Sequence, residues 1–276
     1  MNWPIAMRLW RVLLLAFTGV ACLYLVFPTF VIVPLSFSSS LYLTFPPPGW
    51  STQWYVNLWN SPTYSVAFLH SILIGLPAAA LAMIFGTMLA LALVRGKVWG
   101  TRGLTALAIA PFLLPQIILA IGLYSILAKF GLTASYLGVT LGHAVVATPL
   151  VFITVSAALR SYDSTFEMAA MTLGANGWKS FWFVTFPMIR LGVLAGGIFA
   201  FSFSFDEIII ALFLTNTQTT TLPKQLYSEL RYNMTPTIAA ASSVIITISL
   251  LLLAAVAVIE KRARRRIAAA GVEAKA

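Results

Sequence analysis

Long apolar runs alternate with short polar segments along the whole chain. A helix needs about 20 apolar residues to cross the roughly 30 Å hydrocarbon core of a bilayer. Six runs reach this length, and they are 12–35, 66–94, 104–127, 136–158, 191–214 and 237–259. The pattern therefore predicts an all-α membrane protein with six transmembrane helices.

The segments between these runs predict the domain organisation. Residues 1–63 would hold the first transmembrane helix and an external loop, 64–259 the core with a polar loop at 160–190, and 260–276 a basic tail. Three consecutive prolines at 46–48 argue against a helix in the first external loop.

Two features modify the remaining runs. Pro111 and Pro115 predict a kink in the third run, because proline removes a helical hydrogen bond. Residues 215–236 predict a second polar loop.

The distribution of charge sets the orientation. Only 9% of the residues are charged, against roughly 25% in soluble domains. The net charge is +10, and 14 of the 17 Lys and Arg residues lie in the N-terminus, the loops at 95–102 and 160–190, and the tail. By the positive-inside rule, both termini are expected in the cytoplasm. Because the basic residues form short clusters between apolar runs, nucleic acid is not an expected partner.

Reactive residue types are sparse and isolated. Cys22, His70 and His143 all lie in apolar runs, so we predict no disulfide, no metal site and no nucleophile–base pair. Both histidines are expected to be hydrogen-bonded packing residues. Glycines four residues apart, at 138 and 142 and at 192 and 196, favour close helix packing within the chain over dimerisation.

The most informative polar segment is 162–190. Asp163, Ser164 or Thr165 can cap a helix that runs through 167–173. Gly174 can end this helix in the left-handed conformation. A second cap at Asn176 predicts another helix, which runs through Trp178 towards Pro187 and leads to the membrane.

The first of these helices has a small apolar face formed by Ala169, Ala170 and Leu173. Such a face suits docking into a groove on a cytoplasmic partner. An amphipathic helix lying on the lipid surface would show the same pattern. The residues by themselves leave both alternatives open.

Residues 168–187 resemble the cytoplasmic signature of ABC-importer permeases, which is Glu-Ala-Ala, three residues, Gly, nine residues and Ile-x-Leu-Pro. The chain has Met168-Ala169-Ala170, then Gly174, then Val184-Thr185-Phe186-Pro187. Met168 stands where the family usually has Glu, and Glu167 lies one residue earlier.

Other motifs are similar to those of the second-permease subgroup of spermidine and putrescine importers. They are Pro34-Leu35-Ser36-Phe37, Phe45-Pro46-Pro47-Pro48-Gly49-Trp50, Trp54-Tyr55, Ser204-Phe205-Asp206-Glu207 and Thr219-Thr220-Thr221-Leu222-Pro223. The resemblance covers nearly the whole chain.

The resemblance implies a type I ABC-importer permease fold with a cytoplasmic coupling helix, in the bacterial inner membrane. Such a permease pairs with a second permease, here favoured as a heterodimer, and receives a small polycationic solute from a soluble binding protein. Two ABC ATPase subunits, which use ATP and Mg, dock on the cytoplasmic loops. The implied ATPase-coupling residues are Glu167, Met168, Ala169, Ala170, Leu173, Gly174 and Pro187.

The chain itself is not expected to hydrolyse ATP or to bind a cofactor. Residues 174–180 approach the phosphate-loop pattern, but Trp178 stands where that pattern requires glycine and no strand precedes it. We therefore expect a non-catalytic membrane subunit.

Two adjacent acids are the candidate solute site. Asp206 and Glu207 lie in the fifth run, and an acid at mid-membrane costs on the order of 2.5–3.5 kcal/mol on insertion scales. Because neighbouring helical residues point about 100° apart, at least one acid should face a wet cavity or a cation. The alternative is that one acid pairs with a partner subunit or caps a helix break.

Aromatic and amide side chains complete the candidate pathway. Phe201, Phe203 and Phe205 could contribute cation–π contacts to a polyamine. Gln116 lies beside Pro115, where a break would expose carbonyl groups. The predicted pathway residues are Asp206, Glu207, Phe203 and Gln116.

Three other functions remain as alternatives. An ABC permease could carry another cation, an amino acid derivative or an iron chelate. A self-sufficient secondary transporter or channel would need no ATPase, but it leaves the segment 160–190 without a task. A membrane-embedded enzyme lacks a candidate constellation.

Overall fold

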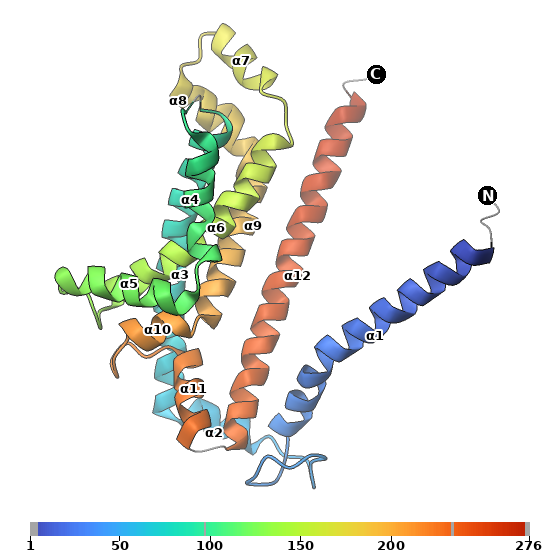
Figure 1. Ribbon diagram of the computed structural model, residues 1–276, viewed down its shortest axis with the longest axis vertical. Helices are drawn as coiled ribbons and strands as arrows, with labels where there is room; N and C mark the ends of the chain where they lie inside the picture. The colour runs from blue at the N-terminus through green and yellow to red at the C-terminus, as the bar shows by residue number, and fades with distance from the viewer. Residues whose placement is uncertain (1–4, 97, 233–234, 274–276) are drawn as a thin grey trace. The chain divides into compact units, whose positions relative to one another are not determined.

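The computed structural model describes residues 5–96, 98–232 and 235–273, and within these ranges the chain is helical with one isolated β-bridge. The elements are α1 (Ile5–Ser36), α2 (Gln53–Asn60), α3 (Pro62–Val94), α4 (Thr101–Leu113), α5 (Gln116–Lys129), α6 (Tyr136–Arg160), α7 (Thr165–Thr172), α8 (Gly177–Ser180), the π-helical η1 (Phe181–Thr185), α9 (Phe186–Asp206), α10 (Ile209–Leu214), α11 (Leu222–Tyr232) and α12 (Pro236–Glu273) (Figure 1).

The prediction of six apolar spans agrees with the helices of the described residues. Five helical segments are long and apolar enough to cross a membrane, and α4 with α5 makes a sixth if the bent pair is one span. The predicted kink in this pair is in fact a break of 101° (Figure 1). Leu114 is extended, with ψ at 144°, because the following Pro115 disfavours the helical conformation of its predecessor.

The loops at 36–63 and 215–236 contain helices that were not predicted from the sequence. α2 begins only after the prolines at 46–48, and it buries Trp54 and Leu58, four residues apart on one face. α11 is amphipathic and buries Leu222 and Leu226 in the same way. The expectation that the prolines exclude a helix from the first loop was wrong, because prolines stop a helix only where they occur.

The fifth span also differs from its predicted bounds. Helix runs from Gly177 through α8, η1 and α9 and ends at Asp206, and α10 is a separate short helix. The widened π turn is closed by the Phe186 N–H, which donates to the Phe181 carbonyl five residues earlier. Pro187 follows in the first turn of α9, and the predicted helix towards this proline continues into the membrane span.

The described residues divide into two compact units. The smaller contains Met1–Pro62 and Ser228–Ile246. Its first loop is folded on itself, because the Trp54 indole N–H donates to the Ser38 carbonyl at 2.7 Å and the Ser36 and Tyr55 hydroxyls lie 2.7 Å apart.

The larger unit contains Thr63–Tyr227 and Thr247–Ala276, and its core lies between α3, α6 and α9. A Cβ atom on Gly196 of α9 would lie 2.4 Å from Thr154 Oγ1, and one on Gly86 of α3 would lie 2.7 Å from Val151 Cβ. On Gly142, a Cβ would lie 2.6 Å from Leu214. Glycine therefore permits close helix packing within the chain, as predicted.

Candidate functional site

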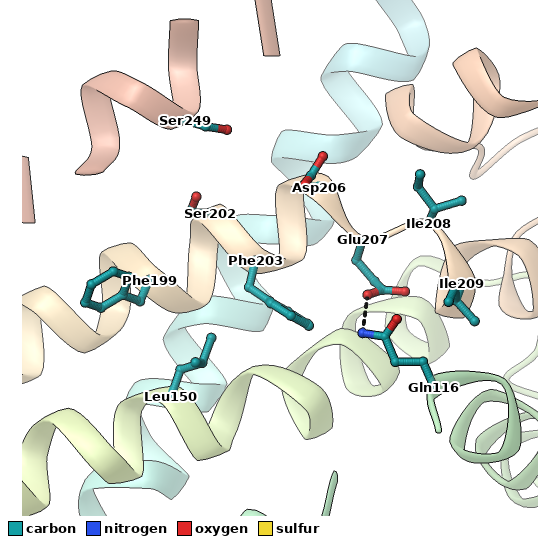
Figure 2. Close-up of a pocket in the computed structure, with 10 residues that line it drawn as sticks. All are labelled: Gln116, Leu150, Phe199, Ser202, Phe203, Asp206, Glu207, Ile208, Ile209 and Ser249. Carbon is teal, nitrogen blue, oxygen red and sulfur yellow. Dashed lines mark hydrogen bonds between the residues drawn. The ribbon is translucent and has the colours of Figure 1, made fainter. Parts of the chain in front are cut away.

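A pocket of about 540 Å³ lies in the larger unit, where the chain leaves α9. Figure 2 shows residues of α5, α6, α9 and α12 around it, together with the linker that leads into α10. Its lining residues are Gln116, Leu150, Phe199, Ser202, Phe203, Asp206, Glu207, Ile208, Ile209 and Ser249. All four predicted pathway residues therefore lie at one pocket.

Glu207 has a structural task at this pocket. Its side chain is buried, and Oε1 accepts a hydrogen bond from the Ile210 N–H at 2.7 Å, at the start of α10. Oε2 lies 3.5 Å from Nε2 of Gln116, which donates to it (Figure 2). Glu207 thus caps the helix after the break, which is the alternative that the sequence analysis left open for one of the two acids.

Asp206 is the acid that remains available to bind a cation. It is the last residue of α9 and is exposed, and its carboxylate points away from that of Glu207 (Figure 2). Within the described part of the chain it accepts no hydrogen bond and forms no ion pair. Because the helix ends between these two neighbours, the Glu207 carboxylate caps α10 while the Asp206 carboxylate can bind a cation.

The aromatic contribution is smaller than predicted. Phe203 lines the pocket and lies 6.0 Å from the Phe112 ring. Phe205 is 2% exposed, and its ring packs against Phe201 at 5.7 Å and edge-on against Phe68. Phe201 and Phe205 therefore belong to the core and are not exposed to a cation in the pocket.

The segment 162–190 has the predicted helix–turn–helix form. Asp163 Oδ1 accepts from the Thr165 N–H at 3.0 Å and from its hydroxyl at 2.8 Å, before α7 begins. Gly174 ends the helix with φ at +89°. Asn176 Oδ1 accepts from the Lys179 N–H at 2.9 Å, which caps α8.

The predicted coupling residues divide between two faces of this segment. Met168, Ala169 and Leu173 are exposed on α7, and Leu173 reaches 89% exposure. Ala170 is half-buried, while Gly174 and Pro187 are exposed.

Glu167 instead faces the protein interior. Its carboxylate accepts hydrogen bonds from Tyr162 and Thr185 and lies 3.6 Å from Arg95 Nε. In the sequence, Arg95 was recognised only as part of the positive charge of the loop 95–102. Its position directly after an apolar span is the available signal, because a basic side chain near helix ends can bond their free carbonyls.

Both histidines pack and form hydrogen bonds, as predicted. His70 Nδ1 lies 3.1 Å from the Thr220 carbonyl, and its ring meets Tyr136 edge-on. His143 is fully buried, with Nδ1 2.8 Å from the Ser204 hydroxyl. Among the described residues, no group of three His, Cys, Asp or Glu side chains could hold a metal ion.

The apolar spans, the pocket with two acids at a helix break and the capped helix α7 together are typical of a membrane-embedded subunit of a transporter. Residues 82–265 match the family described as the binding-protein-dependent transport system inner membrane component. The chain belongs to this family of ABC-importer permeases.

Relatives and solved structures agree with this family. The chain is 34% identical to the putrescine transport system permease protein PotI of Escherichia coli (strain K12), over 87% of this chain and 86% of PotI. It is 28% identical to the spermidine/putrescine transport system permease protein PotC of Haemophilus influenzae, over 82% and 87% of the two chains. A bacterial ABC transporter involved in the import of alginate has the same fold, with a TM-score of 0.69, 15% identity, and coverage of 95% of this chain and 99% of that chain.

Proposed function

We propose that this chain is the permease subunit of an ATP-driven importer of putrescine or spermidine. The observation that carries the proposal is the exposed carboxylate of Asp206, which has no partner among the described residues and lies at a pocket of about 540 Å³. The 34% identity to a putrescine permease over most of the chain supports the same solute class.

The pocket suits a slender cation with an alkyl chain. Asp206 offers a carboxylate to an ammonium group, and the Ser202 hydroxyl lines the same space. Phe203 presents an aromatic ring that can attract a second ammonium group. The apolar side chains of Phe199 and Leu150 would contact the methylene groups between the charges.

Transport also needs partners outside this chain. A second permease, favoured as a heterodimer, would complete the pathway, and a soluble binding protein would deliver the solute. Two ATPase subunits that use ATP and Mg would dock on the exposed face of α7, where Met168 and Leu173 present 53% and 89% of their surface. Both termini would lie in the cytoplasm of a bacterial cell, as the positive-inside rule requires.

Reconstitution in liposomes tests this function. The complete importer would be assembled from this chain, the second permease, the ATPase and the binding protein. We expect uptake of labelled putrescine or spermidine that requires both ATP and the binding protein. Uptake by this chain alone, driven by an ion gradient, would show that it is a secondary transporter. If the assembly hydrolyses ATP in response to the binding protein but takes up no polyamine, the polyamine assignment is excluded and the assignment as an ABC importer is kept.

A further inference from the structure

The helix α7 has an unusual attachment to the rest of the protein. None of its eight residues is buried. A helix of this length is not stable by itself in water and normally relies on packing of an apolar face. Polar contacts must therefore hold α7 in place.

Two hydroxyl donors and one guanidinium group, from three different parts of the chain, converge on one atom of α7, Oε1 of Glu167. The Tyr162 hydroxyl, just after α6, donates to it. The Thr185 hydroxyl of η1, which leads into α9, donates to it at 2.9 Å. Arg95 Nε, just after α3, lies 3.6 Å away. A single carboxylate therefore links α7 to the cytoplasmic ends of three helices.

The donors are themselves held in place. Arg95 Nη2 donates to the Leu159 carbonyl at 2.8 Å and to the Tyr162 carbonyl at 3.2 Å, both at the end of α6. Its guanidinium lies 4.6 Å from the centre of the Tyr162 ring. The planar guanidinium can bind the carbonyls with one nitrogen and face the carboxylate with another, which a lysine cannot do.

Burial strengthens the arrangement. The side chains of Arg95 and Glu167 are 24% and 16% exposed, and Thr185 is 5% exposed. Burial and the contact with Glu167 raise the pKa of Tyr162 above its usual value of 10.0, so its hydroxyl remains a donor throughout the neutral range.

We propose that Glu167 is a positioning residue that braces α7 against α3, α6 and α9, so that movement imposed on α7 reaches the membrane-spanning helices. This inference rests on the proposed ATPase docking at α7. Glu167 therefore lies on the inner side of the coupling segment, because its side chain is only 16% exposed and contacts Tyr162, Thr185 and Arg95. Docking then falls to the exposed side chains of α7, such as Met168 and Leu173.

The test compares variants of the complete importer in liposomes. Glu167→Gln keeps the size of the side chain and removes its charge, and Thr185→Val removes one buried donor. Thr148→Val is the matched control, because the half-buried Thr148 hydroxyl donates within α6, to the Ala144 carbonyl at 2.7 Å, and is not part of α7. Each variant is assayed for polyamine uptake per ATP hydrolysed, for co-purification of the ATPase and for thermal unfolding.

We expect Glu167→Gln to reduce uptake per ATP roughly tenfold, as the loss of a charge-assisted hydrogen bond implies, while the ATPase still co-purifies. Thr185→Val should cause a smaller loss, and Thr148→Val none. Since both substitutions act on one carboxylate, Thr185→Val should add little to Glu167→Gln in the double variant.

Two outcomes would overturn the proposal. One is loss of ATPase co-purification in Glu167→Gln, which would make Glu167 a docking contact. The other is full coupling in both Glu167→Gln and Thr185→Val. Amide hydrogen exchange of α7 in the purified full-length chain does not depend on the solute. Exchange that is faster in Glu167→Gln than in Thr148→Val supports the brace, even if wild-type uptake shows that the solute is not a polyamine. Unchanged exchange refutes the brace.

Discussion

The two adjacent acids at the pocket should respond differently to loss of charge. In Asp206→Asn, the exposed carboxylate at the pocket becomes a neutral amide. A hydrogen bond between a charged donor and acceptor contributes about 1.5–3 kcal/mol, which corresponds to roughly a 10- to 100-fold change in a binding constant. We therefore expect the concentration of putrescine for half-maximal uptake to rise by a factor in that range, or uptake to fall correspondingly.

Glu207→Gln should have a much weaker effect on uptake. The glutamine keeps an acceptor oxygen for the Ile210 N–H, which now binds Glu207 Oε1 at 2.7 Å. Glu207→Ala, in contrast, leaves this buried N–H without its partner, at a cost of about 1–3 kcal/mol. This variant should lower the stability of the protein as well as its uptake.

The assay is ATP-dependent uptake of labelled putrescine and spermidine by the reconstituted importer, with thermal unfolding measured on the same preparations. The order of effects on uptake, Asp206→Asn larger than Glu207→Gln, is the result that matters. If Glu207→Gln abolished uptake while Asp206→Asn transported normally, the division of the two acids into a ligand and a cap would be refuted.

Three further predictions follow from local geometry. Gly86→Ala should destabilise the protein by about 1–3 kcal/mol, because the new Cβ would lie 2.9 Å from the Phe152 backbone nitrogen. The matched control is Gly122→Ala, whose Cβ meets nothing within 4 Å and which should show no loss of stability in thermal unfolding. Gly174→Ala should lower uptake per ATP, because a residue with a side chain is strained at φ +89° by about 1 kcal/mol. The control is Gly177→Ala, because Gly177 also has open space around it but does not have a left-handed backbone. Hydrogen bonds from Thr165 lower the pKa of Asp163 from its usual value of 3.8. The stabilisation of the α7 N-terminus by the Asp163 carboxylate should therefore be complete above pH 3.8 and be lost as the pH falls through the lowered pKa. Asp163→Asn should remove this pH dependence from the circular dichroism of the chain, and an unchanged profile would contradict the assignment.

The sequence by itself determined the features that depend on short stretches of chain. Apolar runs of the required length located the membrane spans, because the hydrocarbon core imposes one length on every helix. Asn176 and Gly174 fixed the two ends of the turn between α7 and α8, since capping and left-handed backbone are properties of a few consecutive residues. The same locality explains the errors, because the prolines at 46–48 act only where they occur and α11 buries one face of a segment that is polar in composition.

Only the tertiary structure decided which way the polar side chains face. Asp206 and Glu207 are neighbours in sequence, yet one is exposed at a pocket and the other caps a helix, because the backbone leaves the helical conformation between them. Glu167 was predicted as a contact to the ATPase, and its contacts come from Arg95 and Thr185, which lie 72 residues before it and 18 after it. Such pairings depend on the rotation and approach of whole helices, and no local pattern along the chain specifies them.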